Sequence, residues 1–93
     1  MIKIKKNDTK AWITFVYTDR EDVDSVKIVG SWNEWKEESL KKRKSGDFSI
    51  TKILPLGQIY EFRYLINEKD WENDADAMEV PNSFGSVNSA IKL

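Results

Sequence analysis

Apolar and polar side chains alternate along most of this chain, and the alternation restricts the fold more than any other property of the sequence. From Ala11 to Thr18, one set of alternate positions carries only apolar or aromatic side chains, and the pattern returns from Ile59 to Ile66. A period of two places alternate residues on opposite faces of a strand, whereas a helix repeats its apolar face every three or four residues. The sequence therefore predicts strands that each bury one face.

The alternating segments, separated by turn residues, predict five strands, over residues 11–18, 23–29, 48–53, 59–66 and 86–93. Leu54-Pro55-Leu56-Gly57 has the proline and glycine of a tight turn, so the third and fourth strands are expected to form a hairpin. Strands without crossover helices are typical of an all-β protein. We expect an antiparallel immunoglobulin-like β-sandwich, formed as a single carbohydrate-binding-module-like domain over residues 1–93.

Two stretches do not alternate. The segment Lys36–Lys44 reads KEESLKKRK and has one leucine, so a solvated loop or frayed turn is expected rather than a packed helix. The segment Asn67–Phe84 is polar and acidic, and its 18 residues exceed the usual length of a connection. A loop this long is expected to have a function of its own.

The composition makes most enzyme classes improbable. The 93 residues contain no Cys and no His, which removes disulfides, thiolate nucleophiles and the usual near-neutral acid–base group. The 16 carboxylates include no recognisable pair across a deep cleft, as a glycosidase requires. Asp74, Asp76 and Glu79 lack the spacing of a calcium loop. We therefore predict no catalytic residue, no metal site and no cofactor.

The charge balance and the N-terminal sequence restrict the partners and the location. With 15 Lys and Arg against 16 Asp and Glu, the net charge is −1, whereas nucleic-acid binding relies on clustered positive charge. The N-terminal MIKIKKND has no apolar run that would serve as a signal peptide, and no stretch of about 18 apolar residues occurs. We expect a cytoplasmic protein without nucleic-acid or membrane partners.

The four tryptophans fall into two groups according to their neighbours. Trp12 lies inside a strand and Trp32 directly follows one, so both are expected in the core. Trp35 and Trp71 are flanked on both sides by charged residues and have no apolar face to join. These two indole rings are therefore expected at the surface, where a flat ring can stack on the C–H face of a sugar while nearby polar groups bond its hydroxyls.

Three motifs, in this order, carry a family resemblance: GSWNEW after a strand, the strand FRYLIN running toward Trp71, and the terminal VPNSFGSVNSAI. Together they resemble the glycogen- and starch-binding carbohydrate-binding modules of family 48. These modules occur in the β subunit of AMP-activated protein kinase and in the N-terminal domain of isoamylase and glucan-branching enzymes. The resemblance covers Val26–Leu93, and it implies that Trp35 and Trp71 are the two tryptophan platforms of the family.

The same resemblance implies the polar contacts of the site. A lysine that reaches sugar hydroxyls in the family corresponds to Arg63, whose planar fork also donates to hydroxyls but with a different geometry. The C-terminal polar contact of the family corresponds to Asn88. Further contacts of the kinase-subunit relatives correspond to Phe84 and Ser86, whereas the acidic run at residues 73–79 is more similar to the isoamylase type.

The function predicted from the sequence is non-catalytic binding of α-1,4-glucan, such as glycogen, starch or maltooligosaccharides. Relatives in branching enzymes frequently lack the platform tryptophans and use the domain structurally, so the presence of both rings favours binding. The alternative is a structural or protein–protein interaction domain associated with a glucan-acting enzyme, because exposed apolar patches also mark protein interfaces. The predicted partners are thus an α-glucan polysaccharide or oligosaccharide and, second, a glucan-acting enzyme.

Overall fold

The structure is a computed structural model that describes residues 1–18, 20–83 and 85–93. Its strands are β1 (Ile2–Lys6), β2 (Lys10–Tyr17), β3 (Val26–Gly30), β4 (Glu38–Ser39), β5 (Lys41–Lys42), β6 (Phe48–Pro55), β7 (Ile59–Ile66), β8 (Asp70–Glu72), β9 (Met78–Pro81) and β10 (Val87–Lys92). A single turn of 3₁₀ helix, η1 (Ser31–Asn33), is the one helical element within these described ranges.

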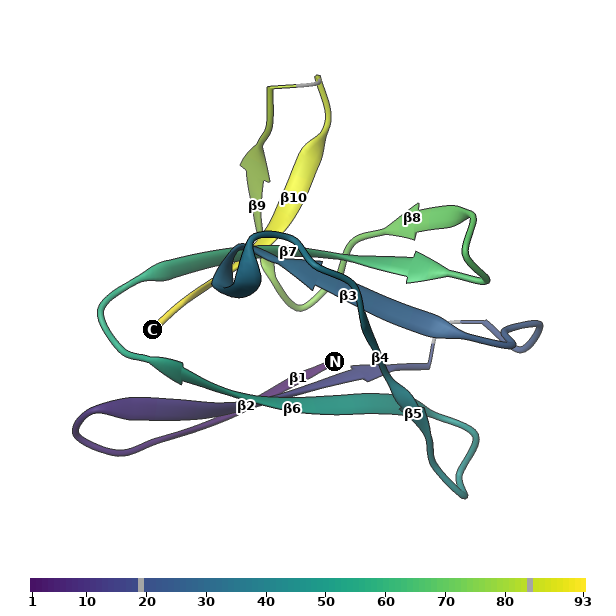
Figure 1. Ribbon diagram of the computed structural model, residues 1–93, viewed down its shortest axis with the longest axis horizontal. Coiled ribbons are helices and arrows are strands. Elements are labelled where there is room, and N and C mark those ends of the chain that lie inside the picture. Colours follow the sequence, from purple (N-terminus) through teal and green to yellow (C-terminus); the bar gives the residue numbers. More distant parts are fainter. Residues whose placement is uncertain (19, 84) are drawn as a thin grey trace.

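The strands form two antiparallel sheets that lie one above the other (Figure 1). One sheet has the order β1-β2-β6-β5, and the other has the order β4-β3-β7-β10-β9, with β8 also paired to β7. This arrangement confirms the predicted all-β, antiparallel sandwich.

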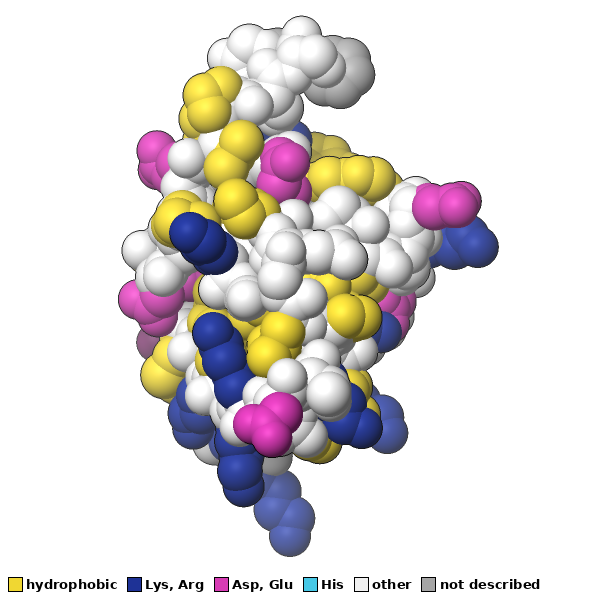
Figure 2. All heavy atoms as spheres, turned by 90° about the vertical axis from the view of Figure 1, so that its left-hand side faces the viewer, with side chains coloured by type: hydrophobic (Ala, Val, Ile, Leu, Met, Phe, Trp, Pro, Cys, Tyr) yellow, Lys and Arg dark blue, Asp and Glu magenta, His cyan; other side chains and the backbone are white. Residues whose placement is uncertain are grey.

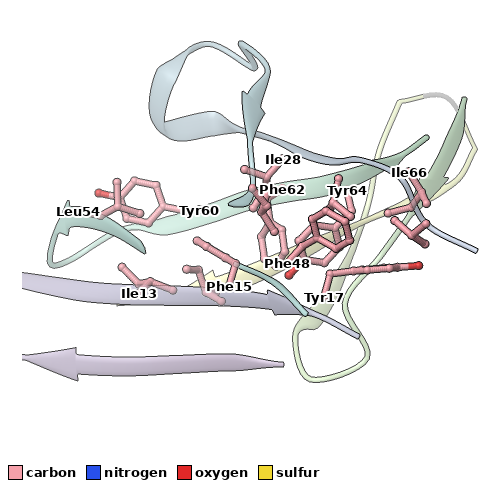
Figure 3. Packing of buried hydrophobic residues seen from close by; sticks show 14 of the residues in the cluster. Ile13, Phe15, Tyr17, Ile28, Phe48, Leu54, Tyr60, Phe62, Tyr64 and Ile66 are labelled. Atoms are coloured by element: carbon pink, nitrogen blue, oxygen red, sulfur yellow. The ribbon is translucent and has the colours of Figure 1, made fainter. Parts of the chain in front are cut away.

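The core lies between the two sheets and consists of the side chains that the alternation turns inward. Phe15 of β2 meets Phe62 of β7 with ring centroids 4.9 Å apart, and Phe62 meets Tyr64 at 5.7 Å, both in edge-to-face geometry. Figure 3 shows these rings between the sheets, with Ile13 and Ile28 beside them. Aromatic pairs of this kind stabilise a core beyond the area that they bury.

The expected hairpin between residues 48–53 and 59–66 is wrong. β6 and β7 belong to different sheets, and the turn around Gly57, whose φ is +87°, carries the chain from one sheet to the other (Figure 1). As a result Leu54 and Tyr60 both join the core from opposite layers. The Tyr60 hydroxyl closes the turn by donating to the Pro55 carbonyl at 2.9 Å.

The segment Lys36–Lys44, expected as a solvated loop, also crosses between the sheets. It contains β4, which pairs with β3, and β5, which pairs with β6 of the other sheet. Leu40 lies between them, 6% exposed, and its amide donates to the Val26 carbonyl at 2.8 Å. The single leucine of this charged segment therefore anchors the crossing in the core.

Two other segments contain strands that the sequence analysis did not predict. The N-terminal residues form β1, which pairs with β2 so that Ile4 lies opposite Ile13. The connection 67–84 contains β8 and β9 and is therefore less irregular than expected. In both cases the strand is short or exposed and depends on its partner for its hydrogen bonds.

The expectation that Trp12 lies in the core is wrong, whereas Trp32 does pack against the core. Trp12 is half-buried on the outer face of the four-stranded sheet, and the Lys10 ammonium lies 5.3 Å from its ring centroid. On the face of the molecule drawn in Figure 2, Lys and Arg side chains gather over its lower part. Trp12 also lines a hollow together with Lys3 and Lys5, so it belongs to a basic outer surface and not to the interior.

Candidate functional site

Four of the six predicted binding residues, Trp35, Arg63, Trp71 and Asn88, gather on the outer face of the six-stranded sheet. Because Phe62 and Tyr64 of β7 point into the core, Arg63 between them points outward, opposite Val29 of β3. Around Arg63 lies a hollow of about 480 Å³, which we call the tryptophan pocket. Its lining residues are Val29, Trp35, Glu37, Arg63, Trp71, Asn82, Ser83 and Asn88.

Trp35 reaches the pocket because the chain turns sharply after β3. Glu34 and Trp35 have φ angles of 62° and 64°, in the left-handed region that a bulky residue rarely adopts. The turn is held by a hydrogen bond of 2.9 Å from the Trp35 amide to the Gly30 carbonyl. The Trp35 side chain is left 40% exposed, as predicted.

Glu38 fixes the other end of this turn. Its Oε1 accepts hydrogen bonds from the Trp32 indole at 3.0 Å and from the Asn33 amide at 2.8 Å, and its Oε2 pairs with Lys52. Burial opposes ionisation of Glu38 most strongly, but the bonds from Lys52 and Trp32 together outweigh it and lower the pKa of this carboxyl. The charged carboxylate is thus the form that holds the turn.

Trp71 lies in the middle of β8, opposite Leu65 of β7. The preceding turn contains Asn67 and Glu68, also left-handed, with φ angles of 52° and 60°. The ring is 47% exposed, again as predicted, and the Arg63 guanidinium lies 5.6 Å from its centroid. An arginine at this distance is attracted to the π face of an indole, so the two side chains position one another.

The residues on either side of Trp71 face the other sheet and hold β8 from behind. The Tyr17 hydroxyl of β2 donates to Glu72 at 2.7 Å. Arg20 donates to both Asp70 and Glu72 at 3.1 Å. Hydrogen bonds to Asp22, Asp70 and Glu72 raise the pKa of Arg20, so it remains a cation. Because Asp70 and Glu72 are tied inward, Trp71 between them points outward.

Arg63 is the polar group of the pocket with the most unused capacity. Its Nε is buried and has no hydrogen-bond partner, and it is the one such side-chain atom among the described residues. Leaving a buried donor without a partner costs free energy in the absence of a ligand or water. A guanidinium in this position can donate to hydroxyl groups placed in the pocket.

Asn88 also lines the pocket, but its side chain is already engaged. It is 9% exposed, and it donates to Glu61 at 3.1 Å while its Oδ1 accepts a hydrogen bond from Asn82 at 3.2 Å. Each of these bonds leaves part of the amide's capacity for a further contact. Asn88 therefore connects β7 to the loop before β10, in addition to facing the pocket.

The remaining predicted contacts lie differently. Phe84 is outside the described residues. Ser86 is exposed and does not line the pocket; its hydroxyl accepts a hydrogen bond from Asn82 at 2.9 Å. The structure adds Asn82 and Ser83, which belong to the same terminal motif and were missed because the motif alone does not say which of its side chains turn toward β7.

Val29 and Glu37 are the other pocket residues that the sequence analysis missed. Val29 alternates with buried neighbours in β3, so its outward direction follows from the strand period, but its place beside Arg63 depends on strand pairing. Glu37 comes two residues after Trp35 in a segment that was expected to be solvated. A charge run of that kind gives no signal for a pocket.

Within the described residues, no group of three or more His, Cys, Asp or Glu side chains could hold a metal ion. Asp74, considered above for calcium, is instead a structural residue: it accepts hydrogen bonds from the Tyr64 hydroxyl at 2.7 Å and from the Asp76 amide at 2.8 Å. A search of the same residues for a helix long and apolar enough to cross a membrane also found none.

The pocket combines two exposed indole rings, a cation with free donors and a carboxylate acceptor. Flat apolar faces bordered by donors and acceptors match a ligand that is itself flat and rich in hydroxyl groups. The arrangement suits non-covalent binding of such a ligand.

Comparisons with known proteins agree with this assignment. A family model described as the glycogen recognition site of AMP-activated protein kinase matches residues 13–93. The chain is 40% identical over 68 residues to the SNF1-related protein kinase regulatory subunit beta-2 of Arabidopsis thaliana, an alignment that covers 73% of this chain and 23% of that protein. It thus spans less than a quarter of that relative.

A solved structure also resembles this chain in fold. The enterobactin esterase FES from Shigella flexneri, crystallised in the presence of enterobactin, has a TM-score of 0.77 over 99% of this chain and 32% of its own. The sequence identity is 12%, so this likeness concerns the fold alone.

Proposed function

The chain belongs to the family described as the glycogen recognition site of AMP-activated protein kinase, and from that premise we propose that it binds α-1,4-linked glucan by stacking glucosyl units on Trp35 and Trp71. Membership of this family supports carbohydrate binding; the two platforms, the polar contacts and the oligosaccharide ligands are our proposal. Arg63 of β7 donates to sugar hydroxyls, and Asn88 of the neighbouring strand β10 helps to orient the sugar chain.

One observation supports this proposal above the others: Trp35 and Trp71, from segments far apart in the sequence, line the same pocket with Arg63 between them. A core residue needs no such exposure, and a pair of indoles around an unpaired guanidinium donor matches successive glucosyl units. Stacking supplies affinity at any position along the glucan, because every glucosyl unit presents a similar C–H face to the rings.

The proposal is tested by removing one platform. Trp71→Ala is expected to weaken binding of maltoheptaose by roughly 1–3 kcal/mol, by analogy with stacking of other flat rings on aromatic side chains. Binding is followed by intrinsic tryptophan fluorescence, which shifts when sugar covers an exposed indole, and by isothermal titration calorimetry.

Trp12→Ala serves as the matched control, because it also removes a half-exposed indole but from the opposite sheet. It should leave maltoheptaose affinity unchanged. If the folded wild-type chain gives no response to maltoheptaose, glucan binding is refuted and the competing function, a protein interface, is favoured. Equal affinity of wild type and Trp71→Ala would remove Trp71 from the site.

The proposal includes the absence of catalysis and a larger context. We expect no hydrolysis or branching of glucan by the chain, and release of reducing sugar above the buffer rate would contradict this. The Arabidopsis relative is named as a regulatory subunit of a protein kinase. We therefore propose that residues 1–93 act as one binding module that brings a kinase or glucan-acting enzyme to its polymer.

A further inference from the structure

The two segments that carry the tryptophans of the pocket are joined by one lysine. Lys27 lies on β3, and its ammonium is 3.2 Å from Oε1 of Glu37 and 2.7 Å from Oε1 of Glu68. Glu37 follows Trp35 by two residues, and Glu68 precedes Trp71 by three. The ammonium therefore bridges the turn that presents one ring to the turn that presents the other.

Strand pairing places Lys27 where it can make this bridge. Lys27 is opposite Leu65 of β7, and Leu65 is opposite Trp71 of β8, so these three residues form one row across the outer face of the sheet. Lys27 does not line the tryptophan pocket. It therefore lies beside the pocket, on the same face of the sheet, and reaches the lining through Glu37.

Lys27 ties the two turns together near their tips, which regular strand pairing does not hold, in addition to the bonds that hold each turn separately. Trp35 and Glu68 both have left-handed backbones, which cost free energy in a residue other than glycine. Without Lys27, Glu37 and Glu68 would be two like charges facing each other across the sheet, and their repulsion would separate the turns.

The environment of Lys27 favours the bridge. Its side chain is 23% exposed, less than those of Glu37 and Glu68, at 51% and 67%. The bond to Glu68 and then the bond to Glu37 raise the pKa of Lys27, and the bond from Lys27 lowers the pKa of Glu68. These shifts favour the charged forms of Lys27 and Glu68, and so the ion pair between them.

We propose that Lys27 is a positioning residue that sets the separation of Trp35 and Trp71, through ion pairs with Glu37 and Glu68, and so matches the pocket to a glucan chain long enough to contact both rings. This inference rests on the proposed function. It adds two expectations about affinity. The effect of Lys27 should depend on ligand length, because the separation of the rings matters only when the ligand contacts both. It should also depend on salt, because salt screens exposed ion pairs.

The test compares Lys27→Met, which keeps an unbranched side chain one atom shorter but removes its charge, with the wild type by calorimetry. Lys27→Met is expected to weaken maltoheptaose binding roughly threefold to fivefold, the range of exposed ion pairs that act together. Glucose, a single unit that cannot stack on two rings at once, should bind both proteins equally. Lys27→Arg should restore most of the maltoheptaose affinity.

Two further arms separate positioning from a general effect on folding or charge. Lys69→Met makes the same change of charge in the turn beside Glu68, at a lysine without an ion pair among the described residues, and should bind like the wild type. In a Trp71→Ala background, Lys27→Met should cause no additional loss. Raising NaCl should weaken maltoheptaose binding by the wild type more than by Lys27→Met.

Each contrary result has a distinct meaning. If the wild type binds maltoheptaose and Lys27→Met binds it equally well, the positioning role is wrong and the proposed function stands. Equal losses for glucose and maltoheptaose would mean that Lys27 contacts sugar or supports the fold, and would also overturn the inference. If the wild type binds no glucan, the proposed function fails and this inference fails with it.

Discussion

Gly30 illustrates how the absence of one side chain shapes the region below Trp35. The Trp32 ring lies directly on this glycine, so that a Cβ added there would be 2.5 Å from the ring. Trp32 in turn packs on Phe15 with centroids 5.5 Å apart. Gly30→Ala must therefore displace the Trp32 ring, which lies between the core and the turn that contains Trp35.

We expect Gly30→Ala to lower the free energy of unfolding by about 1–3 kcal/mol, the usual cost of overpacking, measured by urea unfolding. The near-ultraviolet circular dichroism should also change, because Trp32 moves. Gly46→Ala is the control: its position has φ of +92° but open space around it, so stability should fall with no change in the tryptophan signal. An unchanged spectrum for Gly30→Ala would show that Trp32 is not held by this contact.

At the residue scale, the sequence predicts side chains whose neighbours are unambiguous. Trp35 and Trp71 are flanked by charges, and both are exposed in the structure. Glu37 could not be predicted in the pocket, nor could the engagement of Asn88 by Glu61 and Asn82, because those contacts join segments whose proximity depends on strand pairing. Whether any of these residues binds sugar remains a prediction.

At the scale of elements, β8 shows how a strand of only three residues can hold the Trp71 ring in an outward direction. Its backbone pairs with β7, and the Tyr17 hydroxyl holds Glu72 from the other sheet. Removing the Tyr17 hydroxyl leaves the half-buried Glu72 carboxylate with one hydrogen-bond donor fewer. This loss lowers the free energy of unfolding when the carboxylate is charged.

Tyr17→Phe is expected to lower the free energy of unfolding by about 1–2 kcal/mol and to speed amide hydrogen exchange in β8. Tyr60→Phe removes a hydroxyl that bonds the Pro55 carbonyl, away from β8, and serves as the control. It should lose stability without faster exchange at Trp71 and Glu72. Equal exchange in β8 for both variants would mean that Tyr17 does not anchor this strand.

The elements differ in how far the sequence could predict them. β7 matches its predicted range, Ile59–Ile66, because its long alternation is independent of any partner. β4 and β5 have two residues each and exist only because β3 and β6 lie beside them. The expected hairpin failed for a related reason: a turn motif gives the change of direction but not whether the chain returns to the same sheet.

At the scale of the whole molecule, Glu38 and Lys52 connect the two sheets, since Glu38 belongs to β4 and Lys52 to β6. The pKa of Glu38 is lowered in the folded protein, and so are those of Asp22 and Glu68. A carboxyl with a lowered folded pKa contributes stability that is complete above its unfolded value and is lost as the pH falls through the folded value.

The free energy of unfolding is therefore expected to decrease as the pH is lowered from about 5 to about 3, as measured by urea unfolding at each pH. Glu38→Gln should unfold more easily at pH 7 and should show a shallower decline toward acid. Glu79→Gln changes an exposed carboxylate without an ion pair in the described residues, and should follow the wild-type curve. A Glu38→Gln curve parallel to the wild type would contradict the linkage.

The left-handed backbone at Trp35 places folding and recognition in competition at a single position. Glycine would adopt this conformation without strain, and it would also delete the ring. A redesign that raised thermal stability by relieving backbone strain would thus choose first the substitution that deletes one of the two proposed platforms. A search for more stable variants should keep Trp35 unchanged and make its substitutions elsewhere in the sandwich.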